Sequence, residues 1–335
     1  MDKMAKKDKG FLSDRFGRRI SYLRISITDR CNHRCTYCAP IVEKFKKRAD
    51  ILSFDEIVRI VRLMAEMGVT KVRLTGGEPL VRRGVEDLVG MLSEIYGIED
   101  LSMTTNASLL SGLARGLKQK GLRRLNISLD TLKPGLFREI SGGGELKPVL
   151  LGIDAAIKEG LVPIKFNTVL LRGTNEEELA DILDFAADRM ITVRFIELMP
   201  MSDRIDWKKN YLSIDDVLKR GDIMERVDTS REPERGSTAA YSLPLRSGRG
   251  NAGFISPMSN RFCGQCNRMR LTSDGKLRSC LPADMDVDLK AALKAHAGDE
   301  ELTLLIKKAV SIKPEMGVYT STGEDTEKGM IHIGG

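Results

Sequence analysis

Three cysteines within eight residues are the part of this 335-residue sequence best suited to chemistry. Cys31, Cys35 and Cys38 have the spacing C-x3-C-x2-C and directly follow the alternating apolar run 23–27. A closed zinc site uses four protein ligands, and a cubane iron–sulphur cluster usually takes four cysteines. Because no fourth cysteine lies nearby, the spacing favours a cluster with one open iron. Buried structural cysteines, or one lobe of a zinc knuckle, are the alternatives.

A second group of three cysteines lies in the last third of the chain. Cys263, Cys266 and Cys280 have the spacing C-x2-C-x13-C, again without a fourth cysteine. The nearest later histidine, His296, falls in a helical pattern. We therefore favour a second cluster with one open iron, and a zinc site with a distant fourth ligand is the alternative.

Two arginines follow this second group along an extended segment. Arg268 and Arg270 are two residues apart, so both side chains point to the same face of a strand. Guanidinium groups placed in this way can bind a phosphate or a nucleotide edge through paired, charge-assisted hydrogen bonds. Surface ion pairs are the commoner use of arginine, but the neighbouring cysteines favour a ligand clamp.

The elements that must position these residues alternate between strand and helix from residue 20 to 200. Apolar, β-branched runs predict strands at 23–27, 72–74, 101–105, 124–129, 164–171 and 193–198. Helical patterns lie between them at 53–67, 85–96, 111–120, 148–158 and 176–189. Ser53 and Glu56 form a capping box at the first of these helices. Six such units predict a parallel sheet with external helices, although spacing does not distinguish an open sheet from a barrel.

Polar and glycine residues follow several of the predicted strands. They are found at 75–79, which reads Thr-Gly-Gly-Glu-Pro, at 104–106, at Ser128 and at Met199. In α/β folds the carboxyl ends of the strands form the edge where ligands bind. We therefore expect these residues to surround one site, although 75–79 alone could be an ordinary turn.

Composition is typical of a globular protein, with 41% apolar and 30% charged residues and a net charge of +7. No apolar run approaches the roughly 20 residues that span a bilayer, and the charged start of the chain does not resemble a signal peptide. We expect a cytoplasmic protein without a membrane partner. Residues 1–13 are predicted to be a mobile tail, 14–200 the core domain, and 201–335 a C-terminal region. Seven basic residues and one acidic residue lie between Ser242 and Pro282, around the second cysteine group.

The first cysteine motif, with Tyr37 before its last cysteine, resembles the signature of the radical S-adenosylmethionine (SAM) enzymes. Residues 76–78 resemble the Gly-Gly-Glu motif that holds the SAM amino group in those enzymes. The resemblance implies an α/β fold, an incomplete (β/α)6 TIM-like barrel with a C-terminal iron–sulphur extension. It also implies that SAM binds the open iron of the first cluster.

The two halves together resemble one branch of that superfamily, the GTP 3′,8-cyclases of molybdenum cofactor biosynthesis. The segments that carry the resemblance are 23–31, 74–80, 263–271, 273–276 and the terminal Gly334-Gly335. The likeness extends from about residue 14 to the end and is weakest over 207–251. His33 and Ala39 depart from the family pattern, where an aromatic residue and often a methionine stand. These departures leave the cysteines intact.

The resemblance implies a role for individual residues. Cys31, Cys35 and Cys38 would hold the first 4Fe–4S cluster, and Cys263, Cys266 and Cys280 the second. The residues implied to bind SAM are Tyr37, Gly77, Glu78, Ser128 and Met199. Those implied to bind GTP are Arg24, Lys71, Arg73, Thr104, Lys165, Arg194, Arg268, Met269 and Arg270. The residues implied to assist catalysis are Arg268, Arg270, Gly334 and Gly335, with the glycine tail entering the active site.

The physical logic of the strands agrees with an anionic substrate. Arg24, Lys71, Arg73, Lys165 and Arg194 lie on or beside predicted strands, where a cation is costly unless it faces a cavity that holds an anion. The resemblance implies a lyase that converts GTP to (8S)-3′,8-cyclo-7,8-dihydroguanosine 5′-triphosphate. A 5′-deoxyadenosyl radical derived from SAM would remove the ribose 3′ hydrogen.

The implied partners are GTP, a low-potential electron donor protein and, functionally, the cyclic pyranopterin monophosphate synthase. Nucleic acid is not expected, and a homodimer is left open. Two other functions fit part of this pattern. Another radical SAM enzyme with an auxiliary cluster, such as a peptide maturase, tends to carry more auxiliary cysteines. A basic iron–sulphur or zinc protein that binds nucleic acid would show salt-sensitive binding and no SAM turnover.

Overall fold

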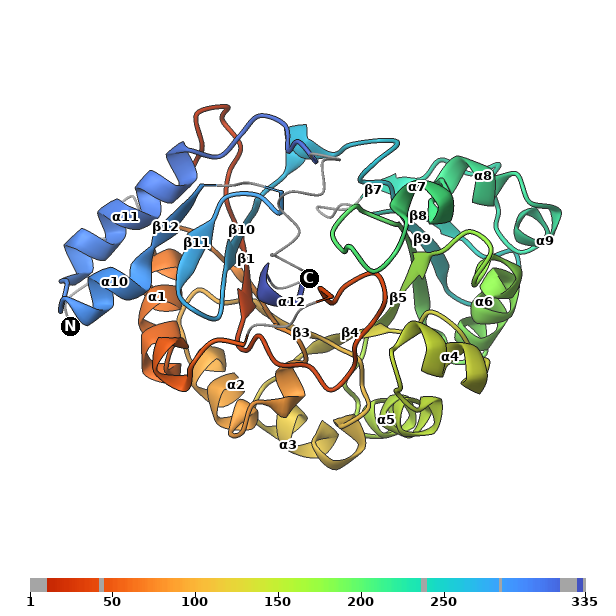
Figure 1. Cartoon of the computed structure of the whole chain (residues 1–335), viewed down its shortest axis with the longest axis horizontal. Helices are drawn as coiled ribbons and strands as arrows, with labels where there is room; N and C mark the ends of the chain where they lie inside the picture. The colour runs from red at the N-terminus through yellow and green to blue at the C-terminus, as the bar shows by residue number, and fades with distance from the viewer. Residues whose placement is uncertain (1–10, 42–44, 236–239, 283–284, 320–329, 334–335) are drawn as a thin grey trace, which may run out of the picture.

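A curved sheet covered by helices forms the body of the protein (Figure 1). The computed structural model describes residues 11–41, 45–235, 240–282, 285–319 and 330–333. The strands in this part of the chain are β1 (Tyr22–Ser26), β2 (Lys71–Thr75), β3 (Asp100–Thr105), β4 (Arg124–Ser128), β5 (Ile164–Leu170), β6 (Thr192–Glu197), β7 (Glu234–Arg235), β8 (Tyr241–Pro244), β9 (Asn251–Ile255), β10 (Arg268–Leu271), β11 (Lys276–Arg278) and β12 (Asp286–Asp288).

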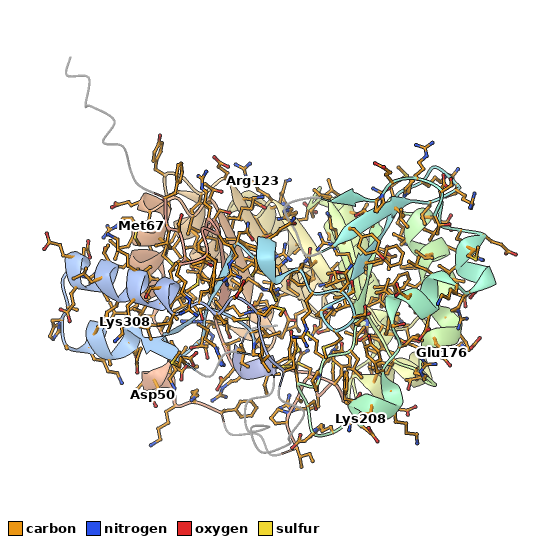
Figure 2. The ribbon with its side chains drawn as sticks, turned by 90° about the horizontal axis from the view of Figure 1, so that it is seen from above. Asp50, Met67, Arg123, Glu176, Lys208 and Lys308 are labelled. Atoms are coloured by element: carbon orange, nitrogen blue, oxygen red, sulfur yellow. The ribbon has the colours of Figure 1, made fainter. Side chains whose placement is uncertain are left out.

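Helices α1 to α6 lie on the convex side of the sheet (Figure 1). Those bounded in the first two thirds of the chain are α1 (Phe54–Glu66), α2 (Val85–Ser93), α3 (Ala114–Gln119), α4 (Pro134–Ile140), α5 (Leu146–Lys158), α6 (Leu179–Ala187), α7 (Trp207–Asn210), α8 (Ile214–Leu218) and α9 (Gly221–Met224). The later ones are α10 (Leu289–Lys294), α11 (Asp299–Ser311) and α12 (Met330–Ile333). Seen from above, Lys308 of α11 and Glu176 lie toward opposite ends of the molecule (Figure 2).

The prediction of an incomplete barrel is confirmed. Within the described residues the strand order is β12-β11-β10-β1-β2-β3-β4-β5-β6-β9-β8-β7. Neighbours from β10 to β9 are parallel, and antiparallel strands extend both ends. The sheet therefore curves without closing on itself, because its first and last strands do not pair. The six predicted strands all form, each within a few residues of the expected bounds.

The C-terminal region contributes to both edges of the same sheet. Strand β9 pairs with β6, and β10 pairs with β1, each in parallel register. The second cysteine group thus lies beside the first strand of the core. The proposed division into domains at residue 200 stays a prediction. Of the expected tail over 1–13, residues 1–10 lie outside the described part, whereas Leu12 is buried and its N–H donates to the Met67 carbonyl.

Local sequence signals account for some of the helix starts. Ser53 and Glu56 make the predicted reciprocal capping box at the start of α1. Helix α4 was not predicted, although Pro134 at its first position is a usual start signal. The predicted helix over 176–189 begins with one 3-10 turn, Glu176–Glu178, before α6. Apolar residues of the helices and of the convex face of the sheet form a large core, and Ile140, Leu171 and Leu198 form a second, small cluster. No helix in the described residues has the length and apolar character that crossing a bilayer requires.

Candidate active site

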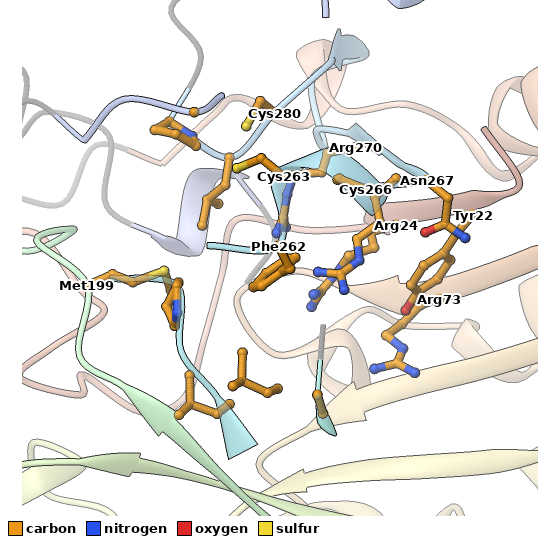
Figure 3. A pocket seen from close by; sticks show the side chains of 18 of the residues that line it. Tyr22, Arg24, Arg73, Met199, Phe262, Cys263, Cys266, Asn267, Arg270 and Cys280 are labelled. Atoms are coloured by element: carbon orange, nitrogen blue, oxygen red, sulfur yellow. The ribbon is translucent and has the colours of Figure 1, made fainter. Parts of the chain in front are cut away.

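Basic side chains gather on the concave face of the sheet because strand alternation and register align them. Arg270 of β10, Arg24 of β1 and Arg73 of β2 are register partners across three parallel strands. On the next strands Ser102 pairs with Arg73 and with Arg124. Alternate residues of a strand face the same side, so these guanidinium groups line one surface. Figure 3 shows Arg24, Arg73 and Arg270 pointing into the same cavity.

This cavity has a volume of about 230 Å³. Predicted GTP residues that line it are Arg24, Lys71, Arg73, Arg194, Arg268 and Arg270. The three cysteines of the second group and Met199 also line it, with Met199 opposite the cysteines (Figure 3). The structure thus brings together residues from both halves of the chain.

The cations of the cavity destabilise one another. Burial and the charge of Arg270 hold the pKa of Arg24 well below its usual value. Burial, with Arg73 and Arg124 nearby, lowers the pKa of Arg194 to about 10. Arginine stays charged in proteins, so these shifts express an electrostatic cost rather than deprotonation. A bound polyanion would remove this cost, and the site is therefore built for one.

Several buried polar atoms near the cavity also have no hydrogen-bond partner among the described residues. Within the described residues, the Tyr22 hydroxyl, the Asn167 amide oxygen and the Arg268 Nε are buried without a hydrogen bond. Both Tyr22 and Asn167 line the cavity. Buried polar groups are nearly always paired in native proteins, so these atoms fit a polar ligand.

Three predicted GTP residues lie elsewhere around this surface. Lys165 is absent from the cavity lining, yet burial and the charges of Arg194 and Arg124 lower its pKa to about 8. Thr104 is half-buried outside the lining. The Met269 side chain is fully buried in the core on the opposite face of β10, so only its backbone is available to a ligand. Their contacts with GTP stay predictions.

The second cysteine group fits a cluster at one end of the cavity. Burial raises the pKa of the Cys280 thiol. Burial also opposes ionisation of Cys266, but Lys313 and Arg268 outweigh it and its pKa is lowered. A Cβ at Gly317 would lie 3.0 Å from the Cys280 sulphur, so this position leaves room only for glycine. The thiols share one cationic, partly enclosed environment, which suits thiolate ligands.

The first cysteine group lies on the loop after β1, outside the lining of this cavity. The backbone N–H of His33 and the Asn106 amide lie 3.3 and 4.0 Å from the Cys31 sulphur. Burial raises the pKa of Cys31 to about 11, and burial with the neighbouring Cys31 raises that of Cys38 to about 12. Among the described residues, no three Cys, His, Asp or Glu side chains are gathered so as to hold a single metal ion. A bound metal centre would invert these pKa shifts, because a coordinating thiol is deprotonated. The donor set fits an iron–sulphur cluster. The departing residue His33 packs edge-on against Phe137, with ring centroids 5.7 Å apart.

The residues predicted to bind SAM surround this loop. The Tyr37 hydroxyl donates to Asp130 over 2.6 Å. The Glu78 carboxylate accepts from the N–H groups of Leu80 and Asn106 and from the Thr105 hydroxyl. A Cβ at Gly77 would lie 2.3 Å from the Arg30 carbonyl oxygen, so the glycine permits close approach to the cysteine loop. Ser128 ends β4 half-buried. Their contacts with SAM stay predictions.

The end of the chain returns to the site. The N–H of Met330, the first residue of α12, donates to the Cys38 carbonyl over 3.1 Å, and Met330 lines the cavity. Figure 1 shows α12 within the curve of the sheet. The predicted catalytic residues Gly334 and Gly335 lie outside the described residues.

Several lining residues were missed from the sequence. They are Tyr22, Arg124, Asn126, Asn167, Arg261 and Tyr319. Alternation could have found three of them, because Tyr22 stands two residues before Arg24, Asn126 two before Ser128, and Asn167 two after Lys165. Nothing in the sequence marks Tyr319, whose hydroxyl lies 3.2 Å from the Met199 sulphur.

Comparison with known proteins places this chain among its relatives. The radical SAM superfamily profile matches residues 25–186, and the Molybdenum Cofactor Synthesis C profile matches residues 191–318. The GTP 3′,8-cyclase of Alkaliphilus oremlandii is 42% identical over 97% of this chain and 100% of its own length. That of Moorella thermoacetica is 43% identical over 97% of this chain and 100% of its own length. The chain belongs to the GTP 3′,8-cyclase family.

Solved structures of other proteins share the fold of this GTP 3′,8-cyclase family member. SuiB of Streptococcus suis, solved bound to S-adenosylmethionine, aligns with a TM-score of 0.63 over 94% of this chain and 72% of that chain. A second SuiB structure aligns with a TM-score of 0.60 over 82% of this chain and 65% of that chain. Sequence identity is 17% and 18%, so the likeness concerns the fold.

Proposed function

We propose that the protein is a radical SAM lyase that converts GTP to (8S)-3′,8-cyclo-7,8-dihydroguanosine 5′-triphosphate in molybdenum cofactor biosynthesis. The observation that carries this proposal is full-length identity of 42–43% to GTP 3′,8-cyclases. The cavity supports it, because its many cations suit a triphosphate and three cysteines stand at its end. The enzyme uses an iron–sulphur cluster and SAM.

Each part of the site has a role in this proposal. Cys31, Cys35 and Cys38 hold the first 4Fe–4S cluster, with Tyr37, Gly77, Glu78, Ser128 and Met199 around SAM. A cluster bound there would supply the electron for reductive cleavage of SAM, and the resulting 5′-deoxyadenosyl radical would remove the ribose 3′ hydrogen of GTP. The arginines hold the triphosphate so that the ribose stays fixed while water is excluded. The GTP set named from the sequence, Thr104, Lys165 and the Met269 backbone included, surrounds the substrate.

Cys263, Cys266 and Cys280 would hold a second 4Fe–4S cluster, and with three protein ligands it would offer a coordination position to the guanine. Its position at the end of the cavity, beside Arg268 and Arg270, supports this role. Reconstituted protein should then contain about eight irons per chain. Cys266→Ala should reduce this to about four, and zinc at the second site would contradict the proposal.

The decisive test of the reaction is an anaerobic incubation of the reconstituted protein with SAM, a reductant and each nucleoside triphosphate. GTP alone should yield the cyclised product together with 5′-deoxyadenosine. Equal amounts of 5′-deoxyadenosine with ATP and no product with GTP would refute GTP as the substrate. Turnover of a peptide instead of GTP would identify a maturase.

The terminal Gly334 and Gly335 assist catalysis inside the cavity. The return of Met330 to the Cys38 carbonyl supports this role, because it brings the end of the chain to the site. Deleting both glycines should abolish product formation and leave the melting temperature unchanged. Full activity of the truncated protein would contradict it.

A low-potential electron donor protein docks near the first cysteine loop. Arg30 and Phe45 are exposed beside this loop, with the Arg30 guanidinium carbon 5.6 Å from the Phe45 ring centroid. A cationic and aromatic surface suits an acidic protein partner. Arg30→Glu should slow reduction by a reduced flavodoxin but not by dithionite. The product passes to the cyclic pyranopterin monophosphate synthase. Whether the protein forms a homodimer would be measured by sedimentation.

A further inference from the structure

A buried lysine stands behind the second cysteine group. Lys313 follows α11 and is only 1% exposed. Its ammonium donates to the carbonyl of Arg268 over 2.8 Å and to the carbonyl of Ser279 over 2.5 Å. Arg268 begins β10, and Ser279 directly precedes Cys280. One side chain therefore joins the two segments that carry the arginines and the last cysteine.

Neither of these partners carries a negative charge. Taking an ammonium group out of water is costly unless an anion balances it. Ser279 directly precedes Cys280 and Arg268 follows Cys266 by two residues, so the two hydrogen bonds place the ammonium group beside cysteines that can become anionic. The burial of Lys313 is thus compensated when the cysteines are thiolates bound to a cluster.

The anchor extends to the segment that follows Lys313. Arg18 is buried, and its guanidinium donates to the carbonyls of Cys263, Pro314 and Glu315 over 2.6 to 2.9 Å. The backbone directly after Lys313 is therefore anchored to the Cys263 segment, while its ammonium group is bonded to the Arg268 and Ser279 carbonyls. A fixed cation beside a redox centre always favours the more negatively charged oxidation state of that centre.

We propose that Lys313 acts on the second cluster in two ways. Its positive charge raises the reduction potential of the cluster, and its hydrogen bond to the Arg268 carbonyl holds the backbone of Arg268 in position. This inference rests on the second cluster of the proposed function. Reduction adds a negative charge to a cluster, so a nearby fixed cation stabilises the reduced form. The residues predicted from the sequence do not include Lys313, because neither its distance along the chain from the cysteines nor its place at the end of a helix distinguishes it from other lysines.

The test compares three variants of the full chain in a background that carries Cys31→Ala, Cys35→Ala and Cys38→Ala, so that only the second site can bind iron. Lys313→Met keeps much of the shape without the charge, and Lys313→Arg keeps the charge. Lys308→Met is the matched control, because Lys308 is exposed on α11, the helix that precedes Lys313 (Figure 2). Redox titration followed by electron paramagnetic resonance measures the potential, and circular dichroism measures folding.

Lys313→Met should lower the reduction potential, while Lys313→Arg and Lys308→Met should leave it near that of the parent. An unchanged potential in Lys313→Met would overturn the proposal. Equal shifts in the Met and Arg variants would also overturn it, because they would show that packing rather than charge is responsible. If Lys313→Met fails to fold, Lys313→Gln carries the same expectation.

Failure of the proposed function gives a different result. If the parent background binds no iron, there is no second cluster, and both proposals fall. If it binds about four irons and the potential is indifferent to residue 313, only the inference about Lys313 falls. GTP binding to the folded variants provides a further measure, because displacement of Arg268 should weaken it in Lys313→Met but not in Lys308→Met.

Discussion

Arg24 of β1 and Arg270 of β10 are direct register partners on neighbouring parallel strands. Burial and the charge of Arg270 lower the pKa of Arg24, and Arg73 continues the row on β2. Like charges in such a pair destabilise a sheet unless something lies between them and balances the charge. This pair is the clearest indication that the concave face is suited to binding an anion and not to stabilising the fold.

Replacing Arg24 separates binding from folding. Arg24→Met should weaken GTP binding roughly tenfold to a hundredfold, because a hydrogen bond to a charged group contributes about 1.5–3 kcal/mol. The free energy of unfolding should fall by less than the lost binding free energy, since burial and the charge of Arg270 already disfavour the Arg24 cation. Calorimetry and urea denaturation would measure the two effects. Arg123→Met, at an exposed position next to β4, is the control and should change neither. A loss of stability in Arg24→Met that matches its loss of affinity would show a role in folding.

Lys165 should make GTP binding dependent on pH. Burial and the charges of Arg194 and Arg124 lower its pKa to about 8, so the free enzyme loses this positive charge as the pH rises through about 8. A bound anion favours the charged form, so GTP affinity should fall as the pH rises through this value.

Lys165→Met should bind GTP more weakly at pH 7 and show a flatter dependence on pH. The stability of the ligand-free enzyme should rise with pH over the range in which GTP affinity falls. Above pH 8 the unfolded chain binds more protons at this lysine, so its contribution to stability rises with pH until the unfolded pKa is passed. Equal pH profiles for the variant and the wild type would show that another group titrates.

Gly77 should be essential for the cysteine loop. In Gly77→Ala the added Cβ would lie 2.3 Å from the Arg30 carbonyl oxygen and 2.9 Å from the Cys31 nitrogen, so the loop must move. We expect the loss of about four irons per chain and of SAM cleavage. GTP binding should persist, because the arginines lie on other elements.

Gly143→Ala is a matched control for iron content, because a Cβ there would contact nothing within 4 Å, although its positive φ adds local strain. Retention of all the iron in Gly77→Ala would mean that the loop can yield.

Glu78 should stabilise the fold in addition to any contact with SAM. Its carboxylate is 1% exposed and accepts three hydrogen bonds, two of them from backbone N–H groups. In Glu78→Gln the amide group must face at least one of these donors, which should cost about 1–3 kcal/mol. Urea denaturation would measure this loss. Glu176→Gln, which lies in the first turn before α6, should be nearly neutral.

Local patterns identified much of the machinery from the sequence. The cysteine spacings, the six strand–helix units and the alternating Arg268 and Arg270 are all properties of short segments, and short segments determine periodicity and metal-ligand spacing. The capping box of α1 was found for the same reason. The resemblance to GTP 3′,8-cyclases added residue roles that no spacing could assign.

The sequence by itself thus determined which residues can bind metal and which strands carry cations. Only the tertiary structure decided that β10 pairs with β1, which sets Arg270 beside Arg24 and brings the second cysteine group to the cavity. Strand pairing between distant segments depends on the curvature and free edges of the whole sheet, which local periodicity does not record. The same reason hid Lys313, because its partners, the carbonyls of Arg268 and Ser279, become neighbours only when β10 joins the sheet.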